Sequence, residues 1–95
     1  MVPPKTLGDA EIGRDLAGLS NWKRDGDELV RTVQLADFDE AISFVDAVAA
    51  TASGLNHHPS IAIDWNKVTL RLSSHDAGGI TERDFTLARA IDALV

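Results

Sequence analysis

The fold is decided by residues 37–73, which read DFDEAISFVDAVAATASGLNHHPSIAIDWNKVTLRLS. Asp37 is a good helix N-cap, and Glu40 three positions later completes the pattern of a capping box. The apolar residues that follow recur at helical spacing and form one stripe, made of Phe38, Ile42, Val45, Val48, Ala49, Ala52 and Leu55. The stretch therefore opens with an amphipathic helix, whose stripe we expect to pack on a core.

Two strands follow this helix. Pro59 favours extended backbone at the residue before it, so the helix should end near residues 54–56. Residues 61–64 are typical of a short strand, with a turn at residues 64–67 and a second strand over residues 68–73. Every second residue of the second strand is apolar from Val68 to Leu72, which predicts one buried face.

The segment before residue 37 predicts a helix and a hairpin. Residues 7–19 carry apolar positions near helical spacing, although each glycine there weakens the helix by about 1 kcal/mol relative to alanine. Residues 22–24 and 29–35 flank Asp25-Gly26, a dipeptide that favours a tight turn. Both alternating sets within residues 29–35 contain apolar side chains, so the pattern leaves the buried face of this strand open.

The segment after residue 73 predicts a glycine-containing loop and a third helix. Thr81 is its N-cap, Asp84 takes the N3 position of a capping box, and Ile80 with Phe85 forms a hydrophobic staple. The buried stripe of this helix is formed by Phe85, Ala88, Ile91 and Val95.

The predicted order of elements is α-β-β-α-β-β-α. Antiparallel hairpins with helices laid on one face of their sheet form a two-layer α+β fold. With 95 residues the chain is expected to be a single domain over residues 1–95, of which residues 1–6 form a flexible arm. So small a core leaves apolar surface that self-association can cover.

Composition excludes several classes of chemistry. The absence of cysteine removes disulfides, thiolate metal sites and cysteine nucleophiles. The formal net charge of −6 offers no basic footprint for a phosphate backbone, so we expect no nucleic-acid partner. No apolar run approaches the length of a membrane span, and the first residues do not resemble a signal peptide. We therefore expect a cytoplasmic protein without a membrane partner.

The main candidates for chemistry are His57, His58 and His75. Histidine exchanges protons near neutral pH, and the first two lie where a helix gives way to a strand. His75 opens a loop after a strand, a position where functional residues often lie. The alternative is that all three are solvated surface histidines, the first pair being favoured by a helix C-terminus. A three-histidine zinc site is a further alternative, but the adjacency of His57 and His58 argues against it.

Other polar residues near these histidines have a structural and a functional interpretation. Asp84 is explained as a capping residue, but the same carboxylate could orient a histidine. Asp76 is either a solvated loop acid or a residue that faces a ligand, and Ser73 and Ser74 are ordinary strand-end hydroxyls unless a pocket lies there.

Four motifs together resemble the pterin-4a-carbinolamine dehydratases, also known as dimerisation cofactors of a homeodomain transcription factor. They are Leu55-Asn56-His57-His58-Pro59, Trp65-Asn66-Lys67-Val68, Leu72-Ser73-Ser74-His75-Asp76 and Gly79-Ile80-Thr81-Glu82-Arg83-Asp84. The resemblance is close over residues 38–95, whereas the first 37 residues agree mainly in layout.

The resemblance implies a four-stranded antiparallel sheet with helices on one face, and a homodimer or homotetramer. It implies a lyase that dehydrates 4a-hydroxytetrahydrobiopterin to quinonoid dihydropterin in tetrahydrobiopterin recycling, without a metal or organic cofactor. His57 and His75 would be the acids that face the hydroxyl, and His58 would hold the pterin and could accept the N5 proton. Residues that would line the pocket are Asn56, Ser73, Ser74 and Asp76, with Asp84 as a supporting carboxylate.

One position departs from the pattern. The family usually has a glutamate four residues before the first histidine, where this chain has Ser53, and Gly54 follows where a lysine is common. Loss of that carboxylate could weaken pterin binding, so we expect activity that is retained but reduced. The alternative from another class is a non-catalytic protein-binding or assembly module on the same scaffold, since a fold does not fix a function.

Overall fold

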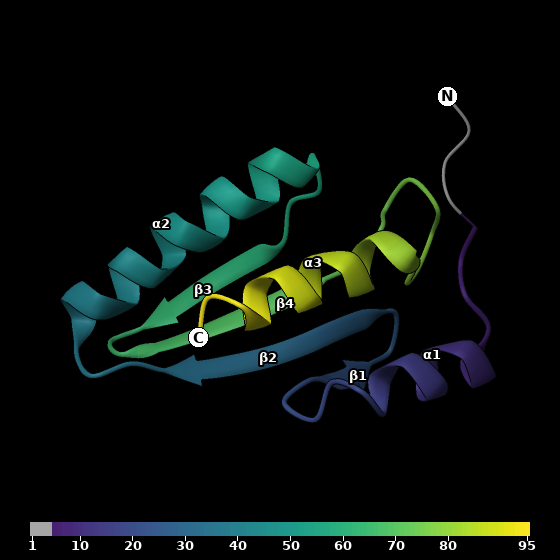
Figure 1. Cartoon of the computed structure of the whole chain (residues 1–95), viewed down its shortest axis with the longest axis horizontal. Helices are drawn as coiled ribbons and strands as arrows, with labels where there is room; N and C mark the ends of the chain where they lie inside the picture. The colour runs from purple at the N-terminus through teal and green to yellow at the C-terminus, as the bar shows by residue number, and fades with distance from the viewer. Residues whose placement is uncertain (1–4) are drawn as a thin grey trace.

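The structure, a computed structural model, describes residues 5–95. Most of the predicted arm, residues 1–4, lies outside the described residues, and residues 5–6 are exposed and belong to no helix or strand. The predicted order of elements is confirmed (Figure 1). The elements are α1 (Asp9–Leu16), β1 (Lys23–Asp25), β2 (Glu28–Gln34), α2 (Phe38–Leu55), β3 (Ser60–Asp64), β4 (Lys67–Leu72) and α3 (Glu82–Asp92).

The four strands form one antiparallel sheet in the order β1-β2-β4-β3. The two hairpins therefore meet through β2 and β4, which pair with Leu29 opposite Leu72 and Val33 opposite Val68. The turn between β3 and β4 contains Trp65 in the left-handed region, with φ at 51°. The next residue, Asn66, donates from Nδ2 to the carbonyl of Leu35 at 3.0 Å and so ties the two hairpins together.

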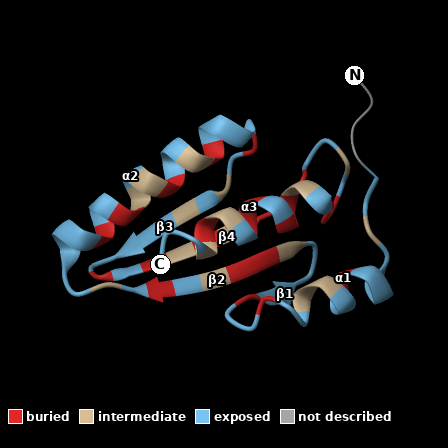
Figure 2. Cartoon of the chain, in the orientation of Figure 1, coloured by how far each residue is buried: buried red, intermediate tan, exposed pale blue. Residues whose placement is uncertain are grey.

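The core lies between the sheet and the two longer helices. Apolar residues of β2 and β4 that share one face, such as Leu29 and Leu70, are fully buried in one cluster with residues of α2 and α3. Figure 2 shows buried residues along these strands and on the sides of α2 and α3 that lie against the sheet. Thr32 and Lys67, on the opposite face, are exposed.

The register decides which face of β2 is buried, a point that the sequence left open. Leu29 and Val33 face the helices, and by strand alternation Arg31 lies on the same side. Its guanidinium forms an ion pair with Asp92 at the end of α3, and the same carboxylate accepts a hydrogen bond from Trp22 Nε1 at 2.7 Å. This pairing allows a charged residue to lie on the core side of the sheet.

The buried stripe of α2 differs from the predicted one. The helix buries Ala41, Phe44, Val48 and Ala52, whereas Phe38, Ile42 and Leu55 are 47%, 36% and 43% exposed. The prediction is confirmed for Val48 and Ala52 and wrong for Phe38, Ile42 and Leu55, because apolar residues cover more than one side of this helix and helical spacing alone admits more than one stripe. The sheet packs against the stripe that begins at Ala41, and Phe38, Ile42 and Leu55 stay at the surface.

Local signals place the ends of the helices, with two corrections. Asp37 caps α2 by accepting from the backbone N–H of Glu40 at 2.8 Å, as predicted. The Glu40 carboxylate, however, accepts from the N–H of Ala36 at 3.4 Å, so the reciprocal half of the predicted capping box is not recorded. The first helix is shorter than residues 7–19 and spans Asp9–Leu16, in agreement with the weakening by its glycines.

Among residues 5–95, no helix combines the length and apolar character needed to span a membrane.

Candidate active site

His57 is aimed at α3 by the way in which α2 ends. Asn56 adopts the left-handed conformation, with φ at 51°, which asparagine tolerates better than most residues. The backbone N–H of His57 then donates to the carbonyl of Ala52 at 3.1 Å and closes the helix. The His57 side chain points away from α2 and toward α3, and the residue is only 8% exposed.

A tight loop brings the end of β4 to the start of α3. Ser74 and Gly79 form an isolated antiparallel bridge, in which the N–H of Ser74 donates to the Gly79 carbonyl at 2.9 Å. Gly78 has φ at 82°, a backbone conformation that residues other than glycine rarely adopt. The loop therefore folds back on itself and places Ser74 against Thr81, the N-cap of α3.

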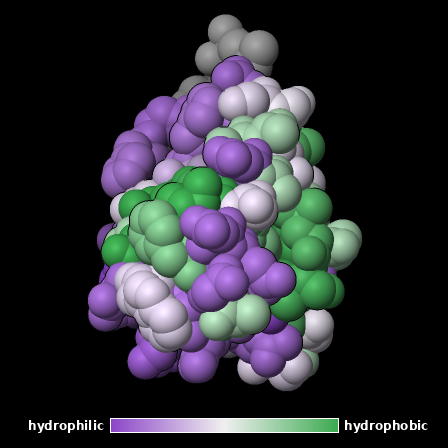
Figure 3. All heavy atoms as spheres, turned by 90° about the vertical axis from the view of Figure 1, so that its left-hand side faces the viewer, coloured by the Kyte–Doolittle hydropathy of each residue, from purple (hydrophilic) through white to green (hydrophobic). Residues whose placement is uncertain are grey.

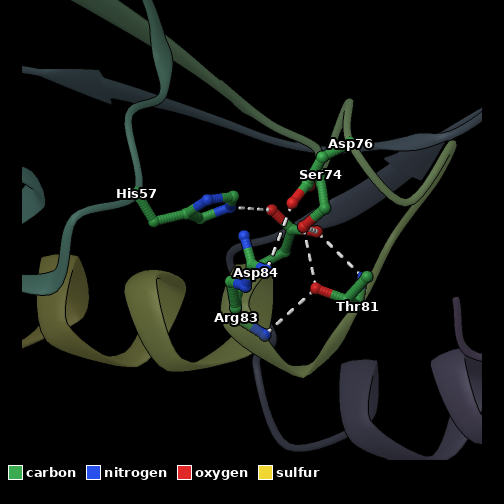
Figure 4. Close-up of polar contacts among 6 residues, drawn as sticks. All are labelled: His57, Ser74, Asp76, Thr81, Arg83 and Asp84. Carbon is green, nitrogen blue, oxygen red and sulfur yellow. Dashed lines mark hydrogen bonds and ion pairs between the residues drawn. The ribbon is translucent and has the colours of Figure 1, made fainter. Parts of the chain in front are cut away.

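A buried hydrogen-bond network joins these segments, as Figure 4 shows. Asp84 is fully buried, and its Oδ1 lies 2.6 Å from Nε2 of His57. The other oxygen, Oδ2, accepts from Ser74 Oγ at 3.0 Å and from the backbone N–H of Thr81 at 2.9 Å. The predicted capping box of α3 is confirmed, and its carboxylate also holds a histidine. Both interpretations of Asp84 therefore apply at once.

The network leaves one nitrogen of His57 available. Nε2 is engaged by Asp84, and no hydrogen bond is recorded for Nδ1 within the described residues. Every fully buried side-chain nitrogen or oxygen in residues 5–95 has a hydrogen-bond partner. Because Nδ1 has no such partner, it is not fully buried, and water can reach it. A buried carboxylate behind an imidazole with one accessible nitrogen is an arrangement suited to proton transfer.

A pocket of about 200 Å³ lies beside His57. It is lined by Leu55, His57, Glu82, Arg83 and Thr86. Arg83 also pairs with Asp76 at 3.2 Å, which connects the pocket wall to the loop after β4. Glu82 and Arg83 were not predicted as site residues, although both belong to the family motif at residues 79–84.

The other predicted site residues are more exposed and lie outside the buried part of this network, with the exception of Ser74; Asp76 reaches it only through its ion pair with Arg83. His58 and His75 are exposed, as are Asn56 and Asp76, and Ser73 is half-buried. None of these five lines the pocket beside His57. Convergence of the three histidines on one ligand therefore stays a prediction. Within residues 5–95, no three histidine or acidic side chains are grouped so that they could hold a metal ion.

Ser74 is the exception, because it lies inside the network. It is 1% exposed, and its hydroxyl contacts Asp84 Oδ2 and Thr81 Oγ1. The predicted contact with substrate would require this hydroxyl to leave both partners.

A second depression lies on the open face of the sheet. It has a volume of about 500 Å³ and is lined by Lys23, Arg24, Asp25, Val30, Thr32, Thr69 and Arg71. Arg71 donates to Asp25 at 3.0 Å and Glu28 at 3.2 Å, and these hydrogen bonds raise the pKa of Arg71. Arg24 is likewise paired with Asp9 at 2.8 Å. Because its arginines are already paired with carboxylates, this depression is a weaker candidate for chemistry than the pocket at His57.

Fold and site together define a two-layer α+β domain with a buried histidine–carboxylate pair between a helix end and a helix start. Comparison with known proteins identifies the family. The family model described as pterin 4 alpha carbinolamine dehydratase matches residues 5–94. A protein of Roseiflexus castenholzii named "Putative pterin-4-alpha-carbinolamine dehydratase" is 52% identical over 89 residues, which are 94% of this chain and 96% of that protein. The chain belongs to the pterin-4a-carbinolamine dehydratase family.

Two solved structures resemble the chain. One is a transcriptional coactivator/pterin dehydratase from Brucella melitensis, with a TM-score of 0.90 and 29% identity, covering 95% of this chain and 98% of the other. The second is a pterin dehydratase-like protein identified as a RuBisCO assembly factor in the alpha-carboxysome. It has a TM-score of 0.66 and 25% identity, and the match covers 78% of this chain and 88% of that one. The scaffold thus occurs in a protein whose described role is assembly.

Proposed function

We propose that this chain is a 4a-hydroxytetrahydrobiopterin dehydratase, a hydro-lyase that forms quinonoid dihydropterin in tetrahydrobiopterin recycling. The reaction breaks the bond between C4a and its hydroxyl, which leaves as water after accepting a proton. The lone pair of N5 forms the new C4a–N5 double bond, and N5 then loses its proton. One proton is delivered and one is removed, so the reaction needs neither an oxidant nor an organic cofactor.

His57 is the proposed acid at the hydroxyl. When its ring is protonated, Nδ1–H donates to the departing oxygen while Nε2–H stays bonded to Asp84. The ionised Asp84 carboxylate, 2.6 Å away, stabilises the charged imidazolium and holds the ring in place. General acid catalysis of this kind accelerates a reaction about 10²–10⁴-fold.

His75 and His58 have the remaining proposed roles. His75 is a second acid at the hydroxyl, and His58 holds the pterin and can accept the N5 proton. Asn56, Ser73 and Asp76 line the substrate site in this proposal. Support for a site in this region comes from the ion pair between Asp76 and Arg83, because Arg83 also lines the pocket beside His57.

The single observation that carries the proposal is the buried contact between His57 and Asp84. The test is a dehydration assay in which the carbinolamine is supplied and its disappearance is followed against buffer. We expect the wild-type chain to accelerate dehydration and His57→Ala to lose most of that acceleration. Absence of any acceleration above buffer by the folded wild-type chain would refute the proposal.

A non-catalytic assembly module is the second candidate. It is favoured by Ser53 in the position of the usual family glutamate, and by the likeness to a structure described as an assembly factor. Pterin binding separates the two candidates. A folded chain that binds no pterin in a fluorescence titration, either as the wild type or as His57→Ala, would support assembly over catalysis.

We also propose that the chain forms a homodimer or homotetramer in the cytoplasm. Support comes from the apolar stripe that α2 does not use in the core, in which Phe38 and Ile42 are exposed. Figure 3, a view of the end of the molecule where α2 begins, shows apolar atoms at the surface between hydrophilic ones. Apolar surface of this kind is commonly covered by association.

A further inference from the structure

The two oxygens of Asp84 have different surroundings. Oδ1 faces His57 Nε2, whereas Oδ2 has two partners, the Ser74 hydroxyl and the backbone N–H of Thr81. Ser74 and Thr81 are 1% and 0% exposed, so water does not readily replace either partner. The two hydrogen-bond donors to Oδ2 are therefore protein groups that are shielded from water.

These groups all donate toward the carboxylate. The N–H of Thr81 can only donate. The N–H of Arg83 donates to Thr81 Oγ1 at 3.2 Å, which leaves the Thr81 proton free for Ser74 Oγ at 2.7 Å. Ser74 is then free to donate its own proton to Oδ2 at 3.0 Å. The result is a continuous chain of donors that ends on Asp84.

The chain of donors determines where the proton between Asp84 and His57 resides. Two donors on Oδ2 favour the ionised carboxylate over the protonated acid, because hydrogen bonds to the charged form stabilise it. An ionised Asp84 has no proton to give, so the short contact at Oδ1 requires a proton on His57 Nε2. A protonated Asp84 would require the opposite, a bare Nε2 and a proton on Nδ1.

We infer that Ser74 and Thr81 are positioning residues, which act through Asp84 to hold neutral His57 in its Nε2–H tautomer. Nδ1 then faces outward with a free lone pair and can exchange a proton with a ligand. The catalytic meaning of this inference rests on the proposed dehydratase function, but the tautomer is a property of the free chain. Ser74 thus supports the site from beneath instead of contacting substrate.

Other charged groups near the ring do not replace Asp84 in this role. Glu82 and Arg83 line the pocket beside His57, and Arg83 is engaged with Asp76 at 3.2 Å. Of these groups, only Asp84 makes a recorded hydrogen bond with the ring.

The test is nitrogen NMR of the histidine rings in the free protein at about pH 9, where an ordinary imidazole is neutral. The two ring nitrogens differ in chemical shift according to which carries the proton. We expect the Nε2–H form of His57 in the wild type. Ser74→Ala should lower the ratio of the Nε2–H to the Nδ1–H form about tenfold, as loss of one hydrogen bond to a charged group implies.

Matched control variants distinguish a positioning role from a nonspecific effect of substitution on the structure. Thr81→Ser keeps the hydroxyl and the backbone donor, so it should keep the wild-type tautomer. Thr69→Val removes one hydroxyl of the Thr32–Thr69 pair, 3.1 Å apart on the open sheet face, and should also leave His57 unchanged. In the dehydration assay Ser74→Ala should lower kcat about tenfold with little change in KM, because the proton is transferred only in the transition state.

Two results would overturn the inference. One is an Nδ1–H tautomer in wild-type His57, which needs no variant and so does not depend on whether Ser74→Ala folds. The other is a wild-type tautomer ratio in folded Ser74→Ala. Failure of the dehydratase proposal is recognised separately, because an inactive wild type with the Nε2–H tautomer would contradict the function and leave the positioning role intact.

Discussion

His57 Nε2 lies 2.6 Å from Oδ1 of Asp84, a residue 27 positions later, and the two side chains are 10% and 0% exposed. One residue follows the end of α2, and the other lies in the first turn of α3. Water hardly competes for this contact, so it can hold the ring in one orientation and stabilise a charge on it.

Replacing Asp84 by asparagine should impair the reaction more than the fold. Asp84→Asn keeps the size of the side chain but removes the charge that stabilises protonated His57, so kcat should fall about 10²–10⁴-fold. Steady-state kinetics with circular dichroism would measure both effects. Asp39→Asn, at an exposed position of α2, is the control and should remain active. Near-normal kcat in Asp84→Asn would exclude a role for the carboxylate in proton transfer.

The two adjacent histidines should differ in the kinetic parameter that they control. His57→Gln removes the proposed acid and should lower kcat about 10²–10⁴-fold with a smaller effect on KM. His58→Gln removes a proposed binding group and should mainly raise KM. Steady-state kinetics of the two variants, made in parallel, provide the comparison. If both substitutions change kcat and KM in the same proportion, the proposed division of roles is wrong.

Restoring the usual family residue at position 53 should increase activity. Ser53 is exposed near the end of α2, and Ser53→Glu would return a carboxylate four residues before His57. We expect a higher kcat/KM, together with a cost in stability of about 0.3–1 kcal/mol, because a negative charge near a helix C-terminus is unfavourable. Ser53→Gln, which has similar size and no charge, is the control. An unchanged kcat/KM in Ser53→Glu would show that this position does not limit the reaction.

The network around Asp92 should contribute to stability and not to chemistry. Asp92→Ala would leave the Arg31 guanidinium and Trp22 Nε1 without their shared acceptor, beneath the end of α3. We expect the free energy of unfolding to fall by about 1–3 kcal/mol, measured by urea denaturation. Asp9→Asn removes the partner of Arg24 in a surface pair whose carboxylate is 89% exposed, and should cost less than about 1 kcal/mol. Equal effects of the two substitutions would contradict the importance of the Asp92 network.

The outer stripe of α2 should control self-association. Ile42 is 36% exposed on this stripe, and Ile42→Glu would place a charge where we expect a second copy to pack. Light scattering after size-exclusion chromatography should show a smaller assembly than the wild type. Asp46→Glu, at another exposed position of α2, keeps the charge already present and should leave the assembly unchanged. A monomeric wild type would rule out the proposed oligomer directly.

Local sequence signals were sufficient for the starts of α2 and α3, whereas α3 ends at Asp92 and leaves Val95, predicted in its buried stripe, 63% exposed. Asp37 and Thr81 cap the helices as predicted, since a cap involves only residues two or three positions apart. The same locality explains the hairpin turn at Gly26, which has φ at 60°. The family motifs also pointed to His57 and Asp84 as site residues before any contact between them was known.

By itself, then, the sequence determined the order of the elements, their approximate limits and the residues available for chemistry, because these depend on short-range backbone preferences and side-chain types. Tertiary packing decided the rest. It chose which apolar residues of α2 meet the sheet, placed Leu29 and Arg31 on the same face of β2, and turned the Ser74 hydroxyl inward to Asp84. These choices depend on which surfaces meet across the sheet, and helical or strand periodicity alone holds no information about the partner surface.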